Sequence, residues 1–361
     1  MISDATHYSP VIYPPPCKQR NVALDWLSGI MMIKIIIMHA IMYYSIPWLN
    51  ETALIMDIVL FMYMPWFFFK AGMYVKAQPL RETLPNAYSR LMVPWIIFGV
   101  LALIILSPVT IGTFDSITEW SEWVFQTTVA DMAMPGNAAL WFLISLFACR
   151  LIASIVPLSH MTWAHATAII GFIAALLFHA KSPQLWDKLL MFPNIFMAVF
   201  FYASGYILHK KQYDRRVAIS AAVVFMLLTI LDSQRADMRT NGGMIDSPIA
   251  YSLFYPRALS AIVVINYLAH RLPTSYLKKS ILSYIGRNSM AFYVIHMPLM
   301  LSCKIVLLHA TDLSSSTQLI IMLATVTISL PVADILLRRY CPEALGLKRD
   351  RKSMTAPDEL P

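Results

Sequence analysis

The sequence has few charged residues. Only 13% of its 361 residues are Asp, Glu, Lys or Arg, whereas soluble globular domains carry about 25%. Hydrophobic residues make up 58% of the chain, so no polar segment is long enough to form a sizeable soluble domain. The alternating strands of about ten residues that mark a membrane β-barrel are absent as well. These absences argue against a soluble enzyme and favour an all-α membrane protein.

Cysteine motifs, internal repeats and low-complexity segments are also lacking. The cysteines at positions 17, 149, 303 and 341 are scattered without CxxC spacing. We therefore predict neither a disulfide nor a metal site. Residues 1–25 have no apolar core, which argues against a cleavable signal peptide. We expect them to form a cytoplasmic N-terminal segment, followed by a first span that stays in the membrane as an anchor.

Long hydrophobic runs fill most of the remaining chain. A run of about 20 apolar residues can cross a bilayer as a helix, and about ten such runs are present. The predicted spans are 26–46, 53–75, 91–111, 139–159, 162–180, 192–208, 217–231, 248–270, 284–309 and 316–337. We therefore predict a ten-helix transmembrane domain over 26–337 and a basic cytoplasmic tail over 338–361. The polar part of this tail, after Arg339, is expected to be loosely ordered.

The placement of Lys and Arg predicts the orientation of the spans, because these residues concentrate on the cytoplasmic side of a membrane. If the N-terminus lies inside, the outer segments hold only Lys181, Lys188, Arg235 and Arg239. Five further basic residues lie within spans, namely Lys34, Lys70, Arg150, Arg257 and Lys304. The others of the 28 lie in inner segments. The asymmetry places both termini in the cytoplasm and explains the net charge of +8 without a nucleic-acid partner.

Two histidines lie inside apolar spans. A charged group at membrane depth costs at least ~2.5–3.5 kcal/mol, so such residues usually face a cavity or a partner. His39 lies roughly 20 Å from the inner face at 1.5 Å per residue, and His296 lies deep in the span 284–309. Histidine can accept and return a proton near neutral pH, which suits a general base. The alternative is that each histidine hydrogen-bonds between helices and serves packing.

Four basic residues lie at inner or middle depth, namely Lys34, Lys70, Arg90 and Arg150. Together they could hold an anionic ligand that enters from the cytoplasm. Arginine holds a phosphate through a bidentate fork, whereas lysine acts as a point charge. The alternative is that these side chains extend to the headgroups of the inner leaflet.

Asp57 is a candidate partner for His39. It lies roughly 6 Å below the outer end of the second span, and His39 lies roughly 10 Å below the outer end of the first. The two spans form an antiparallel hairpin, so these depths nearly match. A carboxylate there would fix the tautomer of the histidine and stabilise its cation. Two alternatives are that Asp57 faces an outer aqueous cavity or pairs with Lys304.

Several motifs in order carry a resemblance to a known family. They are ALDWLSGIMMIKIIIMHA (23–40), MPWFFFKAGMYVK (64–76), SRLMVPW (89–95), LWFLISLF (140–147) and YIGRNSMAFYVIHMPL (284–299). Each is similar to a motif of the acyltransferase-3 family of bacterial membrane acyltransferases, and they follow in the family's order. The resemblance covers nearly all of the predicted membrane region.

The resemblance implies an activity. Members of this family transfer an acyl group, most often acetyl, from cytoplasmic acetyl-CoA to a hydroxyl of a glycan or glycolipid at the outer side of the inner membrane. The hallmark histidine maps to His39, which would deprotonate the acceptor hydroxyl, and the family arginine maps to Arg90. His296 and Asp57 are further catalytic candidates. The basic group Lys34, Lys70, Arg90 and Arg150 would then line a channel for the phosphates of acetyl-CoA.

One position departs from the family pattern. The family usually has Arg or Lys about three helical turns before the histidine and on the same face, but this chain has Ser28 there. Lys34 points about 140° away from His39 on a helix, and Lys70 on the neighbouring span is the other substitute. The departure leaves a catalytically weakened family member as one alternative. A transporter or flippase of glycan or lipid precursors is the other, and the acceptor glycan stays open.

Overall fold

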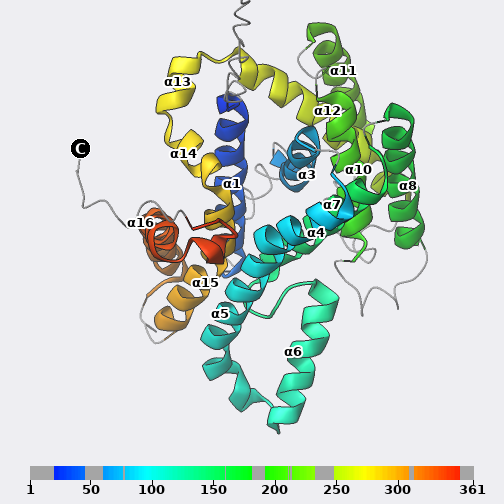
Figure 1. Ribbon diagram of the computed structural model, residues 1–361. Helices are drawn as coiled ribbons and strands as arrows, with labels where there is room; N and C mark the ends of the chain where they lie inside the picture. Colours follow the sequence, from blue (N-terminus) through cyan, green and yellow to red (C-terminus); the bar gives the residue numbers. More distant parts are fainter. Residues whose placement is uncertain are drawn as a thin grey trace, which may run out of the picture.

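The computed structural model describes residues 20–44, 60–75, 78–158, 160–180, 192–209, 211, 214–231, 248–308 and 313–349. Every regular element in these ranges is a helix (Figure 1), which confirms the all-α prediction. The first half contains α1 (Val22–Met42), α3 (Tyr63–Met73), α4 (Leu80–Ala87), the π-helix η1 (Tyr88–Met92), α5 (Val93–Thr110), η2 (Ile111–Thr113), α6 (Ile117–Asp131), η3 (Ala138–Leu140), α7 (Trp141–Ile155) and α8 (Met161–Ala180). The second half contains α10 (Asn194–Leu208), α11 (Arg215–Leu231), α12 (Pro248–Arg271), α13 (Thr274–Lys279), α14 (Ile281–Arg287), α15 (Ser289–Leu307), α16 (Ser315–Tyr340) and η5 (Pro342–Leu345).

Seven helical stretches among the described residues are long and apolar enough to cross a membrane. They are Val22–Met42, Leu80–Thr113, Ala138–Ile155, Met161–Phe178, Tyr251–Arg271, Ser289–Leu307 and Ser315–Tyr340. Helix α10 is a shorter apolar helix, and α3 and α11 overlap two further predicted spans. The predicted total of about ten spans and the cytoplasmic placement of both termini stay predictions.

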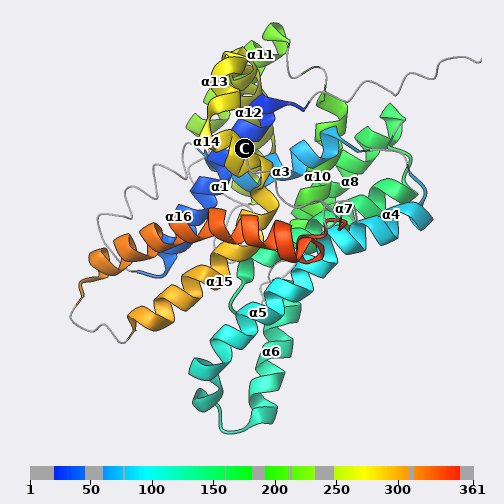
Figure 2. The ribbon, with the colours of Figure 1, turned by 60° about the vertical axis from the view of Figure 1, so that its left-hand side comes forward.

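Helix α1 lies in the middle of the bundle. In the view of Figure 1, α8, α10, α11 and α12 lie on one side of it and α14, α15 and α16 on the other, and α15 and α16 contact each other (Figure 2). Helices α5 and α6 project together as a hairpin from one end of the molecule. Helix α1 contacts α3, α12, α14, α15 and α16, and this central position lets it carry residues that meet several other helices.

Glycines bring two pairs of helices into backbone contact. On α1 and α14, a side-chain carbon at Gly286 would overlap the carbonyl of Asp25. On α3 and α10, a side-chain carbon at Gly72 would overlap the carbonyl of Tyr202, and one at Gly205 would overlap that of Phe69. Only residues without a Cβ permit such close packing. These contacts fix the positions of α1 and α3, which carry His39 and Lys70.

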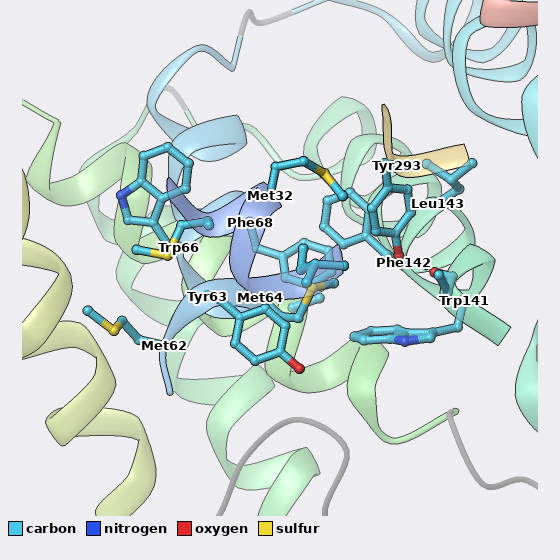
Figure 3. Packing of buried hydrophobic residues seen from close by; sticks show 14 of the residues in the cluster. Met32, Met62, Tyr63, Met64, Trp66, Phe68, Trp141, Phe142, Leu143 and Tyr293 are labelled. Atoms are coloured by element: carbon cyan, nitrogen blue, oxygen red, sulfur yellow. Dashed lines mark hydrogen bonds between the residues drawn. The ribbon is translucent and has the colours of Figure 1, made fainter. Parts of the chain in front are cut away.

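An aromatic cluster joins the helices around α1. Figure 3 shows Met32 of α1, Phe68 of α3, Phe142 of α7 and Tyr293 of α15 packed together. The ring centroids of Phe68 and Phe142 lie 4.7 Å apart, and those of Phe142 and Tyr293 lie 5.4 Å apart. Aromatic pairs at such distances contribute ~0.5–1.5 kcal/mol beyond their burial. The cluster therefore stiffens the four helices that surround the candidate site.

The beginning of the C-terminal tail is ordered against the bundle, which corrects the expectation of a loose segment after Arg339. The 3-10 helix η5 buries Pro342, Ala344 and Leu345. Gly346 follows with φ of 67° and packs on the backbone of Arg90. The polar composition of the tail concealed this contact, because three small or apolar residues suffice to anchor it.

Candidate active site

The two predicted histidines meet. Nδ1 of His39 on α1 lies 2.9 Å from Nε2 of His296 on α15. Their rings stack at a centroid distance of 5.1 Å with an interplanar angle of 23°. His296 is fully buried, while His39 is partly buried. The fold therefore joins two residues that are far apart in the sequence into one hydrogen-bonded pair.

The hydrogen bonds of His296 determine which nitrogen of each ring carries a proton. Nδ1 of His296 lies 2.7 Å from the carbonyl oxygen of Tyr293 and 3.2 Å from that of Phe292. A carbonyl only accepts hydrogen bonds, so this Nδ1 is the protonated nitrogen. In the neutral ring Nε2 of His296 is then an acceptor, and Nδ1 of His39 must donate to it. The neutral His39 ring therefore has its lone pair on Nε2, the nitrogen that can take a proton.

Lys70 lies against Ser28, the position at which the family usually has a basic residue. Its Nζ lies 2.5 Å from Oγ of Ser28 and 3.8 Å from Oδ1 of Asp25. The Ser28 hydroxyl donates to the carbonyl of Leu24 at 2.7 Å, so it accepts from the Lys70 ammonium. A positive charge from α3 is therefore present beside α1, about three helical turns before His39.

Asp25, near the N-terminus of α1, interacts with Lys70 and Arg20. It lies in the first turn of the helix and is 6% exposed. Its Oδ2 accepts a hydrogen bond from Nε of Arg20 at 2.5 Å. A carboxylate near a helix N-terminus is favoured by the helix dipole, and two cations neutralise it further. Asp25 was not a predicted site residue, although a carboxylate at the start of an apolar span is a signal that could have indicated it.

A cavity of about 620 Å³ opens beside Lys70. Three of the four basic residues predicted to hold an anion line it, namely Lys70, Arg90 and Arg150. Its polar lining also includes Tyr74, Gln78, Thr83, Asn86, Ser154, Tyr202, Ser289 and Tyr293. A second cavity of about 390 Å³ shares the lining residues Val75, Gln78, Ala153 and Ser154. The two cavities therefore adjoin each other, and together they are lined by cations, hydroxyls and amides.

Arg90 projects from a break in the helical repeat. It lies in the middle of η1, where the N–H of Val93 bonds to the carbonyl of Tyr88 across five residues. Pro94 follows at the start of α5 and has no N–H to donate. Such π-helical turns are rare and frequently occur at functional sites. The C-terminal segment packs on this turn through Gly346 and supports the backbone that presents Arg90.

Tyr293 lies between the cavity and the histidine pair. This tyrosine lines the cavity, and the centroid of its ring lies 5.9 Å from that of His296. Phe142 also lines the cavity and packs against Tyr293. One aromatic residue therefore separates the basic cavity from the buried His296 ring.

Lys34 does not line this cavity. It is 1% exposed, and its Nζ lies 3.5 Å from the centroid of the Tyr63 ring. A desolvated cation over an aromatic face is stabilised by the ring quadrupole. The structure thus separates Lys34 from the other three basic residues with which the sequence grouped it.

Asp57, the predicted partner of His39, lies outside the described residues. Lys304, its alternative partner, places Nζ 4.1 Å from the centroid of the Tyr44 ring. Sequence reasoning also missed Asn137, which is buried beside α15. Asn137 follows Pro and Gly in MPGN, a pattern that predicts a turn but no function. In the described part of the chain, no three His, Cys, Asp or Glu side chains could together hold a metal ion.

Comparison with known proteins identifies the class. The family model described as an acyltransferase domain matches residues 21–338, nearly the whole chain, and this confirms the resemblance inferred from the sequence motifs. The chain belongs to this acyltransferase family, and its apolar helices make it a multi-pass membrane protein. A search of curated proteins found no match, and a search of solved structures found none either.

Proposed function

We propose that the protein is an integral-membrane O-acyltransferase. It moves an acyl group, acetyl in the family's usual case, from cytoplasmic acyl-CoA to a hydroxyl of a cell-surface or exported glycan. The observation that carries the proposal is the hydrogen-bonded pair His39–His296 beside a cavity lined by Lys70, Arg90 and Arg150. A proton acceptor next to a cationic cavity suits transfer from a donor that carries phosphates.

His39 acts as the general base. Its Nε2 takes the proton of the acceptor hydroxyl while the oxygen attacks the thioester carbonyl, so a C–O bond forms and the C–S bond breaks. The CoA thiolate leaves and takes the proton from the His39 imidazolium. Neutral His296 accepts the Nδ1–H bond of His39 throughout, and this bond stabilises the imidazolium and fixes its ring. Asp57 stays a predicted further partner of His39.

Lys70, Arg90 and Arg150 bind the phosphates of the donor. All three line one cavity, and guanidinium and ammonium groups are the usual protein ligands of phosphate. Lys70 takes the role of the basic residue that Ser28 replaces, because its ammonium contacts the Ser28 hydroxyl. This substitution from a neighbouring helix supports an active enzyme over a weakened family member.

The acceptor class rests on the resemblance to the family, as does the placement in a bacterial inner membrane. The direct test uses membrane vesicles from cells that produce the protein, supplied with radiolabelled acetyl-CoA and an extract of the cells' own polysaccharides. We expect label to enter the polysaccharide fraction with wild-type protein and not with His39→Ala. Transport of a labelled glycan precursor without acetyl transfer would instead establish the transporter alternative.

A further inference from the structure

A proline opens the backbone of α15 next to His296. Pro298 lies inside the helix and has no N–H to donate to the carbonyl of Val294, four residues before it. In a regular helix the proline ring would also clash with that carbonyl. His296 lies between these two residues, so the backbone that carries it lacks one of the hydrogen bonds that normally hold a helix.

Asn137 supplies a donor from another part of the chain. Its Nδ2 lies 3.1 Å from the carbonyl oxygen of Val294, and the residue is fully buried. The amide orientation follows from this contact, because a flipped amide would set two acceptor oxygens against each other. Oδ1 of Asn137 has no hydrogen-bond partner among the described residues. Asn137 thus buries a second polar atom at a cost, and the contact that its N–H makes with Val294 offsets this cost.

A second hydrogen bond clamps the same two segments together. The hydroxyl of Tyr293 donates to the carbonyl of Ala139, which lies in η3 just after Asn137. The Tyr293 carbonyl in turn accepts from Nδ1 of His296. The segment that carries Asn137 and Ala139 therefore holds α15 at two adjacent residues, and one of them holds the His296 ring.

We propose that Asn137 is a positioning residue for the reaction. By holding the Val294 carbonyl that Pro298 leaves open, it fixes the backbone from which His296 receives its tautomer and orientation. His296 then keeps Nε2 directed at Nδ1 of His39, so that Nε2 of His39 remains the basic nitrogen. This inference rests on the proposed function, in which His39 is the general base.

A double-mutant cycle tests the inference. Asn137→Leu keeps the branched shape of the side chain but removes the donor, and we expect kcat to fall roughly 10- to 100-fold because small misplacements of catalytic groups have effects of this size. The KM for acetyl-CoA should stay within about twofold, since Asn137 does not line the donor cavity. Pro298→Ala adds the missing N–H to α15. In that background Asn137→Leu should lower kcat by no more than about threefold, because the helix now satisfies its own carbonyl.

Thr167→Val is the matched control. Thr167 is also buried in an apolar helix, α8, and its hydroxyl donates to the carbonyl of Trp163 at 2.7 Å. Its removal should change the unfolding temperature but leave kcat within about twofold, because Thr167 has no link to the histidines. A fall in kcat equal to that of Asn137→Leu would reduce Asn137 to an ordinary packing residue and overturn the proposal.

Nitrogen-15 NMR of histidine-labelled protein in bilayers provides a test that does not depend on activity. In wild-type protein we expect His296, assigned through His296→Gln, to be protonated at Nδ1, and we expect this tautomer to become mixed in Asn137→Leu. An unchanged tautomer in that variant, or its wild-type kcat, would refute the positioning role. If wild-type protein transferred no acetyl group but the tautomer still depended on Asn137, only the proposed function would fail.

Discussion

Two regions of the site differ in how their polar groups are satisfied. One is the histidine pair, and the other is the basic wall of the cavity, formed by Lys70, Arg90 and Arg150. His296 is buried, and its two ring nitrogens contact Tyr293, Phe292 and His39. The side chain of Lys70, by contrast, is 22% exposed and lines a cavity with Arg90 and Arg150. A fully bonded buried network is rigid, whereas cations around a cavity can still bind a ligand. The first region is therefore built to hold one geometry, and the second to receive charge.

The largest effect is expected from removal of the base. His39→Ala should lower kcat by ~10²–10⁴-fold, the range that a positioned general base contributes, with little change in the KM for acetyl-CoA. Acetyl transfer by purified protein in proteoliposomes measures both quantities. His296→Gln should lower kcat by less, because His39 would remain as the base and would lose only its hydrogen-bond partner. Full activity of His39→Ala would remove this residue from the mechanism. The histidine pair would then not be the catalytic region that we distinguish from the basic wall.

A substitution in the basic wall should change the affinity for the donor more than it changes kcat. Lys70→Met removes an ammonium group that we propose binds the donor phosphates. The donor affinity should fall roughly 10- to 100-fold, as expected for loss of a charged hydrogen bond. The change in kcat should be smaller. Titration calorimetry with CoA measures the affinity directly, and Lys278→Met on α13 is the matched control because it does not line the cavity.

Restoring the family pattern sharpens the same comparison. In the Lys70→Met protein, Ser28→Lys would return a cation to the position beside α1 that Lys70 now occupies. We expect most of the lost CoA affinity to return. Equal affinity in wild-type and Lys70→Met proteins would show that the donor binds elsewhere, and the replacement of Ser28 by Lys70 would then be structural only.

The sequence was informative where one helix or one motif carried the signal. The motif of the first span identified His39, and the apolar runs predicted an all-helical chain. The sequence did not predict which distant segments of the chain contact each other. The approach of Lys70 to Ser28 depends on α3 packing against α10 through Gly72 and Gly205, which no local pattern reveals.

Asn137 illustrates the same limit more strongly. Its neighbours predict a turn, and its role exists only because Pro298, far along the chain, leaves the Val294 carbonyl open. The sequence shows the proline and the asparagine but not that the asparagine reaches the Val294 carbonyl. Lys34 was grouped with Lys70 by depth in the membrane alone, and depth does not state which face of a helix meets a cavity.

The smallest effect on activity is expected at Lys34, and it separates two interpretations of this residue. If Lys34 binds the donor, Lys34→Met should weaken CoA binding as strongly as Lys70→Met. The structure favours a stabilising role, because Lys34 is 1% exposed and lies over the Tyr63 ring. A desolvated cation–π contact is worth ~2 kcal/mol, so Lys34→Met should unfold at a lower temperature in detergent. Its CoA affinity should stay within about threefold of wild type. A loss of affinity comparable to that of Lys70→Met, at unchanged stability, would return Lys34 to the donor site and extend the basic wall into the buried region beside α1.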